Sequence, residues 1–269
     1  MQIFQDGYLH TTCDSECWIT FRRIRCDAEI VDPRILQTIS RLQAKFIALH
    51  CHEIGGKSSK THMQHVEIFV QILLSSNELQ QFDKAEIFLD EDFSHTENFT
   101  ALGNLYFIHK LLTDAMIWNF KDLKFQNLTG RNIHSGNIKK VSIKEKFKFP
   151  ENFFPEVEFG KKGYIWTRWQ LNGTTFDLVN LHLFHDASNF VAKQAFPSVY
   201  TIRRKNALQY MLNRFNNYEK ESVPIFLFGD FNFRPDTPGV VRKLTTGLSE
   251  CKDEENIDNG KLKYKDDAG

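Results

Sequence analysis

The chain has 269 residues, of which 41% are hydrophobic, and its 34 basic and 34 acidic side chains give a net charge of zero. A neutral chain disfavours sequence-independent binding of nucleic acid, which needs a basic surface. No uncharged apolar run reaches the roughly 18 residues of a membrane span, and the N-terminus lacks the basic start and apolar stretch of a secretory signal. Five scattered cysteines favour a reducing compartment over a disulfide framework, so we expect a cytoplasmic protein without a transmembrane segment.

The predicted elements alternate between helices and strands along the chain. Asp32 and Pro33 form a typical helix start, and the apolar residues that follow recur at helical spacing. The segment KFIALHCHE is then predicted as a strand, followed by a second helix over 63–73 and by short strands between about 85 and 130. Two β-rich runs flank the dipeptide Asn-Gly at 172–173 and predict a hairpin with a type I′ turn. A third helix is predicted over 207–215, before the strand IFLFGDFNF.

These elements predict an α/β fold in which two β-sheets pack face to face and helices flank them on the outside. No internal repeat is visible in the sequence. We expect three parts: a divergent N-terminal segment over 1–30, a domain over 31–250 that holds the predicted elements, and a polar, charged tail over 251–269 that is disordered.

Polar side chains stand where three predicted strands end. Glu53 closes the first strand, His182 lies in the segment VNLHLFHD, and Asp230 and Asn232 end the last predicted strand. Because residues two apart on a strand face the same side, Asp230 and Asn232 point together out of the strand's end. An ionised carboxylate at the edge of a core is costly unless something binds it. Taken alone, a residue such as Glu53 is more often a solvated side chain, and one such as His182 a satisfied core histidine.

Taken together, the polar side chains at the three strand ends favour a magnesium site. Carboxylate and amide oxygens are hard ligands for Mg²⁺, which keeps several waters and is shared with substrate phosphate. The spacings His50-x-His52 and His182-x-x-His185 leave a zinc hydrolase as the alternative. A basic stretch of the chain is either a solvated face or the site of a small, highly anionic ligand. This stretch comprises Lys139, Lys140, Lys144, Lys146, Lys148, Lys161, Lys162 and Arg168.

Longer stretches around these residues resemble one family. The chain is similar to type I inositol polyphosphate 5-phosphatase in the segments ALHCHEIGGK, FTALGNLYFIHK, KGYIWTRW, FDLVNLHLFHDASN, PSVYTIRRKNAL and FGDFNFR. That family belongs to the superfamily of Mg²⁺-dependent phosphatases and nucleases with the DNase I-like fold, and the resemblance runs from about residue 35 to 245. It implies a four-layer sandwich of two packed sheets between helices. It also implies hydrolysis of the 5-phosphate from inositol 1,4,5-trisphosphate and inositol 1,3,4,5-tetrakisphosphate, the soluble inositol phosphates of calcium signalling.

The resemblance further implies a role for each motif residue. Glu53 would bind Mg²⁺, and Asp230 would orient or deprotonate the attacking water. Asn232 would help to hold the phosphate or the metal, and His182 would hydrogen-bond the scissile phosphate. Three further basic residues in matching stretches would hold the ring phosphates. These are Lys162, Arg168 and Arg204.

The chain also departs from the family pattern. His52 stands where the family has Gln, and no N-terminal strand ending in Asn is found. The chain lacks the Pro-x-Trp-Cys-Asp-Arg segment and the Asp-His pair that the family carries after the stretch matching Arg234. It also lacks the closing prenylation box, which implies peripheral membrane association for full-length relatives.

From these departures we expect an incomplete sandwich whose apolar residues near 225–233 are exposed. Three interpretations stay open at this point. The chain is an inositol polyphosphate 5-phosphatase, a catalytically incomplete inositol-phosphate-binding relative or fragment, or a nuclease of the same fold. The neutral charge disfavours the nuclease.

Overall fold

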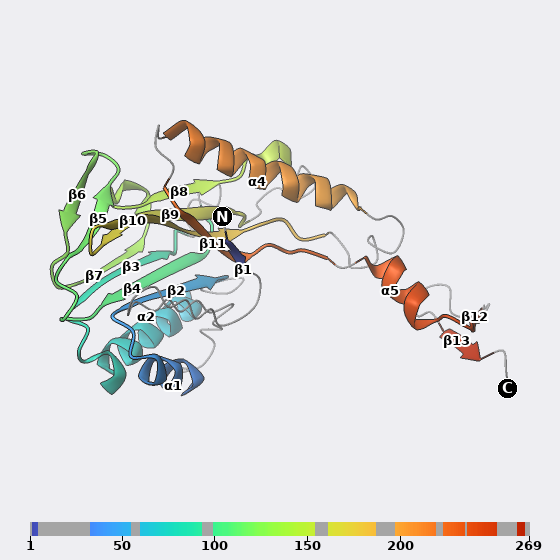
Figure 1. The fold of residues 1–269 in the computed structure, drawn as a ribbon, viewed down its shortest axis with the longest axis horizontal. Coiled ribbons are helices and arrows are strands. Elements are labelled where there is room, and N and C mark those ends of the chain that lie inside the picture. Colours follow the sequence, from blue (N-terminus) through green and yellow to red (C-terminus); the bar gives the residue numbers. More distant parts are fainter. Residues whose placement is uncertain are drawn as a thin grey trace.

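The structure, a computed structural model, describes residues 2–4, 33–54, 60–92, 99–153, 161–186, 197–218, 223–234, 236–251 and 263–266. The strands within these segments form two large sheets and one short hairpin (Figure 1). No helix in the same segments is both long and apolar enough to cross a membrane.

The larger of the two sheets has the strand order β1-β11-β10-β9-β5-β6, and β8 pairs with the start of β9. Its strands are β1 (Gln2–Phe4), β5 (Ala115–Asn119), β6 (Lys124–Asn127), β8 (Glu145–Lys148), β9 (Gly163–Leu171), β10 (Thr174–His182) and β11 (Ile225–Asp230). The smaller sheet has the order β2-β4-β3-β7. Its strands are β2 (Phe46–His52), β3 (Lys84–Asp90), β4 (Leu102–Ile108) and β7 (Arg131–Gly136).

Helices cover the outer face of each sheet (Figure 1). The helices α1 (Pro33–Leu42) and α2 (Lys60–Ser75) pack their apolar residues against the smaller sheet. The helix α4 (Val199–Tyr218) packs against the larger sheet. The sheets face each other across a third apolar layer that contains Phe46 and Tyr106 from one sheet and Trp169 from the other. Two packed sheets between helices are the predicted fold class, which is therefore confirmed.

β10 is a central strand that is covered on both faces. Leu178 faces the smaller sheet, whereas Val179 and Leu181 face α4. Because both faces are covered, apolar residues occupy both of them, and the polar residues Asp177 and Asn180 of the strand are buried as well. The turn before this strand is also the predicted one. Asn172 and Gly173 both have positive φ angles, 46° and 79°, as a type I′ turn requires.

The strand β11 is better covered than the sequence led us to expect. β1 pairs with it in parallel, with Gln2 opposite Phe226. Leu227 and Phe228 are buried, and Ile225 and Phe226 are half-buried. The expectation of exposed apolar residues is therefore wrong for the centre of this strand, because β1 covers its edge and the opposite sheet covers Phe228.

The outer parts of the predicted domain organisation lie mostly outside the described residues. Of the N-terminal segment 1–30 the structure describes only β1, and of the tail 251–269 it describes Cys251 and the strand β13 (Lys263–Asp266). β13 pairs with β12 (Leu248–Cys251). This hairpin and the helix α5 (Thr237–Leu244) project from the sandwich at the right of Figure 1.

Candidate active site

Strands from both sheets end at one edge of the sandwich. β10 and β11 run parallel and end in register, with His182 opposite Asp230. β9 is antiparallel to β10 and begins at Gly163, opposite His182. Residues that pair directly across strands project from the same face of the sheet. His182 and Asp230 therefore project together, and 3.8 Å separates His182 Nε2 from Asp230 Oδ2.

The imidazole of His182 is held by a lysine. Lys162 immediately precedes β9, and its Nζ lies 2.5 Å from Nε2 of His182, with both side chains buried. This buried contact fixes the orientation of the His182 ring at the end of β10.

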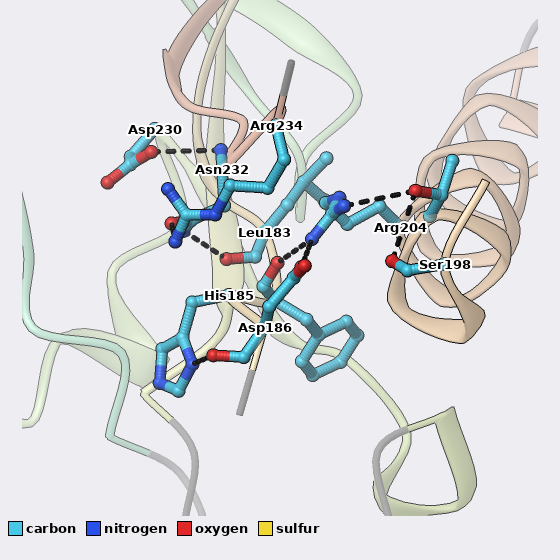
Figure 2. A network of polar contacts seen from close by, with 10 residues as sticks. Leu183, His185, Asp186, Ser198, Arg204, Asp230, Asn232 and Arg234 are labelled. Carbon is cyan, nitrogen blue, oxygen red and sulfur yellow. Dashed lines mark hydrogen bonds and ion pairs between the residues drawn. The ribbon is translucent and has the colours of Figure 1, made fainter. Parts of the chain in front are cut away.

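The end of β11 is shaped by one glycine and two polar residues. Gly229 has a φ of 139°, and a Cβ there would lie 1.9 Å from the carbonyl oxygen of Leu181, so only glycine fits. Asp230 Oδ1 then accepts the backbone N–H of Asn232 at 2.9 Å. Asn232 adopts a φ of 50° and donates from Nδ2 to the carbonyl of Leu183 at 2.8 Å (Figure 2). Its amide oxygen consequently faces away from Leu183, toward Arg234.

The end of β2 brings a carboxylate and a second imidazole to the same edge. Glu53 is exposed and has a φ of 55°, a strained conformation for a residue other than glycine. His52 is buried, and its ring centroid lies 5.8 Å from that of His182. Burial lowers the pKa of His52 to about 4, while the charges of Asp230, Lys162 and Glu53 all act on the same ring. Glu53 therefore lies at the same edge as the pair His182 and Asp230.

Both predicted phosphate-binding arginines are paired with buried carboxylates. Arg168 lies in the middle of β9, where its guanidinium binds both carboxylate oxygens of Asp177 at 2.7 and 2.8 Å. Five residues of strand, or about 17 Å, separate it from Gly163. The structure thus does not bring Arg168 to the site. Arg204 binds Asp186 and donates to the carbonyl of Phe184 at 3.2 Å, so it fastens the segment after β10 to α4 (Figure 2).

The basic stretch on β8 is not the solvated face that its composition suggests. Lys144 is 3% exposed, and burial, with a smaller effect from nearby Lys146, lowers its pKa to about 8. Lys146 Nζ lies 2.8 Å from Oδ1 of Asp90, which is fully buried at the end of β3. Thr100 donates its backbone N–H and its hydroxyl to the other oxygen of Asp90, at 2.7 and 2.6 Å. Sequence reasoning missed this tie between the sheets. The only sign of it was the alternation of lysines at 144, 146 and 148, which places them on one strand face.

The donor atoms at the strand ends fit Mg²⁺ better than zinc. Within the described segments, no three His, Cys, Asp or Glu side chains gather into a group that could hold a metal ion. A zinc site with three protein ligands needs such a group. Mg²⁺ instead takes one or two carboxylates and completes its shell with water and substrate phosphate. The carboxylates of Glu53 and Asp230 and the amide oxygen of Asn232 are the kind of oxygen donors that Mg²⁺ takes.

Curated relatives identify the family. Inositol polyphosphate-5-phosphatase A of Canis lupus familiaris is 45% identical over 210 residues, which cover 78% of this chain and 51% of the relative. The Homo sapiens protein of the same name is 44% identical over the same lengths. A probable type I inositol 1,4,5-trisphosphate 5-phosphatase of Caenorhabditis elegans is 34% identical over 243 residues, 89% of this chain and 54% of the relative. The chain spans about half the length of the curated relatives it matches.

Other comparisons add little to this identification. No protein-family model matches the chain. The inositol polyphosphate 5-phosphatase domain of a synaptojanin, solved with inositol (1,4)-bisphosphate and a calcium ion, has a TM-score of 0.40 and 12% identity, covering 76% of this chain and 48% of that chain. D. rerio TDP2 with a single-strand DNA product has a TM-score of 0.41 and 10% identity, covering 92% and 79%. With TM-scores this low, neither structure serves to assign the family of this chain. On the sequence relatives alone, this chain belongs to the type I inositol polyphosphate 5-phosphatase family.

Proposed function

We propose that this chain hydrolyses the 5-phosphate of inositol 1,4,5-trisphosphate and inositol 1,3,4,5-tetrakisphosphate in the cytoplasm, with Mg²⁺ as cofactor, and so ends a calcium-mobilising signal. The curated relatives, which are named as inositol polyphosphate 5-phosphatases, support the reaction class. The observation that carries the proposal is the meeting of Lys162, His182 and Asp230 at one edge of the larger sheet.

Each of these side chains has a chemical task in the proposed reaction. Asp230, oriented by the N–H of Asn232 on Oδ1, would hold the attacking water in line with the scissile bond. His182, whose Nε2 lies 3.8 Å from Asp230, would hydrogen-bond the scissile phosphate. The ammonium of Lys162 would add positive charge beside that phosphate, where charge develops in the transition state.

Glu53 and Asn232 would hold the metal at the edge where strands of both sheets end. Mg²⁺, when bound, would neutralise charge on the phosphate oxygens and lower the barrier to attack by water.

Lys148 pairs with Gly163, which itself pairs with His182, so this lysine stands in the same row across the sheet. We assign Lys148 to the non-scissile phosphates of the inositol ring.

The test is phosphate release from inositol 1,4,5-trisphosphate by the purified chain with Mg²⁺. Asp230→Asn should lower the rate by at least about 100-fold, the usual contribution of a positioned acid or base. Asp114→Asn removes an exposed carboxylate just before β5 and should leave the rate unchanged. Release by the unaltered chain that Asp230→Asn does not diminish would refute the assignment of Asp230.

Two alternatives give different results in the same assay. A catalytically incomplete relative would bind inositol trisphosphate without releasing phosphate. The chain's span of about half of its relatives keeps this outcome open. A nuclease would instead shorten an oligonucleotide and leave the inositol phosphate intact. A chain that neither binds nor hydrolyses inositol phosphates would overturn the proposal.

A further inference from the structure

One buried side chain crosses the layer between the two sheets. Asn180 of β10 is fully buried, and its Nδ2 lies 2.7 Å from Oδ1 of Asn104, 3.1 Å from the carbonyl of Gly103 and 3.2 Å from the carbonyl of Cys51. Cys51 and Gly103 are themselves paired residues of β2 and β4. The amide group therefore joins the larger sheet to two strands of the smaller sheet at a single point.

This bridge lies one step inside the candidate active site. Asn180 precedes His182 by two residues on β10, and Cys51 precedes Glu53 by two residues at the end of β2. Two residues of strand span about 7 Å. A hydrogen-bonded contact between Asn180 and Cys51 therefore restricts how far the end of β2 can move from the end of β10. The restraint is transmitted along the backbone, from Cys51 to Glu53 in the smaller sheet and from Asn180 to His182 in the larger sheet.

The bridge is directional, which an apolar contact would not be. The amide of Asn180 turns its nitrogen toward three acceptors, and Oδ1 is left buried without a hydrogen bond. That oxygen lies close enough to His52 to raise its pKa, although no full hydrogen bond joins the two. A buried oxygen without a partner costs about 1–3 kcal/mol. The amide thus makes its contacts across the layer although its own oxygen stays unpaired.

We infer that Asn180 is a positioning residue that sets the separation between the Glu53 end of β2 and the paired ends of β10 and β11. Through this separation it tunes the metal affinity of the site. The metal part of the inference rests on the proposed function, whereas the geometric part rests on the bridge alone. Positioning residues around a metal site typically change its affinity by about 10- to 100-fold.

The experiment compares Asn180→Leu with a matched control, Thr167→Val. Thr167 lies in the same buried layer on β9, and its hydroxyl lies 2.9 Å from the hydroxyl of Tyr106 on β4. Thr167→Val therefore removes a hydrogen bond between the sheets, together with the bond that the indole N–H of Trp169 donates to the same hydroxyl at 3.0 Å, and it does so deeper in the sandwich. Mn²⁺ binding to the purified chain is measured by electron paramagnetic resonance. Hydrogen–deuterium exchange is followed in the peptide that covers 46–54, and the melting temperature of each variant is recorded.

We expect Asn180→Leu to weaken Mn²⁺ binding at least about tenfold and to speed exchange at the end of β2. Thr167→Val should lower the melting temperature while its Mn²⁺ affinity stays within about twofold of the original chain, because its bond is remote from the strand ends. An unchanged affinity and exchange rate in Asn180→Leu would overturn the inference. Equal weakening by both variants would also overturn it, since it would reflect a general loss of stability.

Two further outcomes are distinguishable. If the unaltered chain binds no Mn²⁺, the metal site of the proposed function fails. The inference is then decided by exchange alone, which should rise at 46–54 in Asn180→Leu and not in Thr167→Val. If Asn180→Leu does not fold, Asn180→Ser takes its place, because a hydroxyl keeps one donor. Asn180→Ser is then held to the same criteria, which are Mn²⁺ binding weakened at least about tenfold and faster exchange over 46–54.

Discussion

Two histidines at the end of β2 show how burial changes the chemistry of a residue. His50 is fully buried, with Nε2 at 3.1 Å from the hydroxyl of Tyr106 and its ring edge-on to Phe228. Burial, with a smaller effect from neighbouring His52, lowers the pKa of His50 to about 3. In an unfolded chain the pKa of a histidine is about 6.5. The folded protein therefore keeps a neutral imidazole where the unfolded chain binds a proton.

This difference predicts acid sensitivity. Below pH about 6.5 the unfolded chain binds more protons than the folded one, so the free energy of unfolding falls as the pH decreases toward the folded pKa of about 3. His50→Gln keeps a polar partner for Tyr106 and removes the titration. Its free energy of unfolding, measured in urea between pH 6.5 and 4.5, should fall less steeply than that of the original chain. Parallel curves for the two proteins would contradict the prediction.

The hairpin of β9 and β10 shows how an element gives a charged residue a structural task. Its turn places Arg168 opposite Asp177 in the register of the two strands. The guanidinium of Arg168 also lies over the rings of Trp166 and Tyr218, at 5.5 and 5.8 Å from their centroids. Both charged side chains are buried, and they neutralise each other within the hairpin. The element thus places Arg168 in the core, away from any phosphate at the strand ends.

Arg168→Met should therefore lower stability and spare the site. Removal of one member of a buried pair leaves an uncompensated charge and costs about 3–5 kcal/mol. The free energy of unfolding should fall by that amount, while the affinity for inositol trisphosphate measured by calorimetry stays the same. The double variant Arg168→Met with Asp177→Leu serves as the control and should recover most of the stability. A loss of affinity for inositol trisphosphate without a loss of stability would instead show that Arg168 binds the substrate.

At the scale of the whole molecule, the larger sheet is closed on one side by a very short strand. β1 supplies three residues that pair with the centre of β11, and β11 carries Asp230 at its end. An uncovered strand edge is a template for association with another chain. The N-terminal residues therefore protect the strand on which the candidate site depends.

Removal of residues 1–4 should make the protein associate. The edge of β11 would lose its partner strand, so light scattering during gel filtration should detect larger species at concentrations where the full chain is monomeric. Removal of residues 267–269, which belong to none of the described strands, is the matched control and should have no such effect. A shortened chain that behaves like the full chain would show that β1 is dispensable for solubility.

Local chemistry in the sequence was sufficient for several features. The turn at Asn172 and Gly173 is encoded locally, because both residues tolerate the positive φ that a type I′ turn needs. Strand periodicity also identified apolar runs that form the two packed sheets. It placed Asp230 correctly at the end of β11, but Asn232 lies beyond that strand with a φ of 50°, so the predicted period-2 relation does not hold for this pair. The roles of Glu53, His182, Asp230 and Asn232 stay predictions that the assays above will decide.

Only the tertiary structure decided which polar groups meet. Lys146 binds Asp90, which is 56 residues away, and Asn180 reaches Cys51 across 129 residues. Lys162 lies against His182, which is 20 residues further along the chain. The pairing of Arg168 with Asp177, by contrast, follows from the register of one hairpin. Periodicity along a strand tells which side a residue faces, but it says nothing about the distant strand that packs against that side. Whether a charged side chain is buried, and which distant residue pairs with it, depends on that packing. Both are therefore decided only when the two sheets pack together.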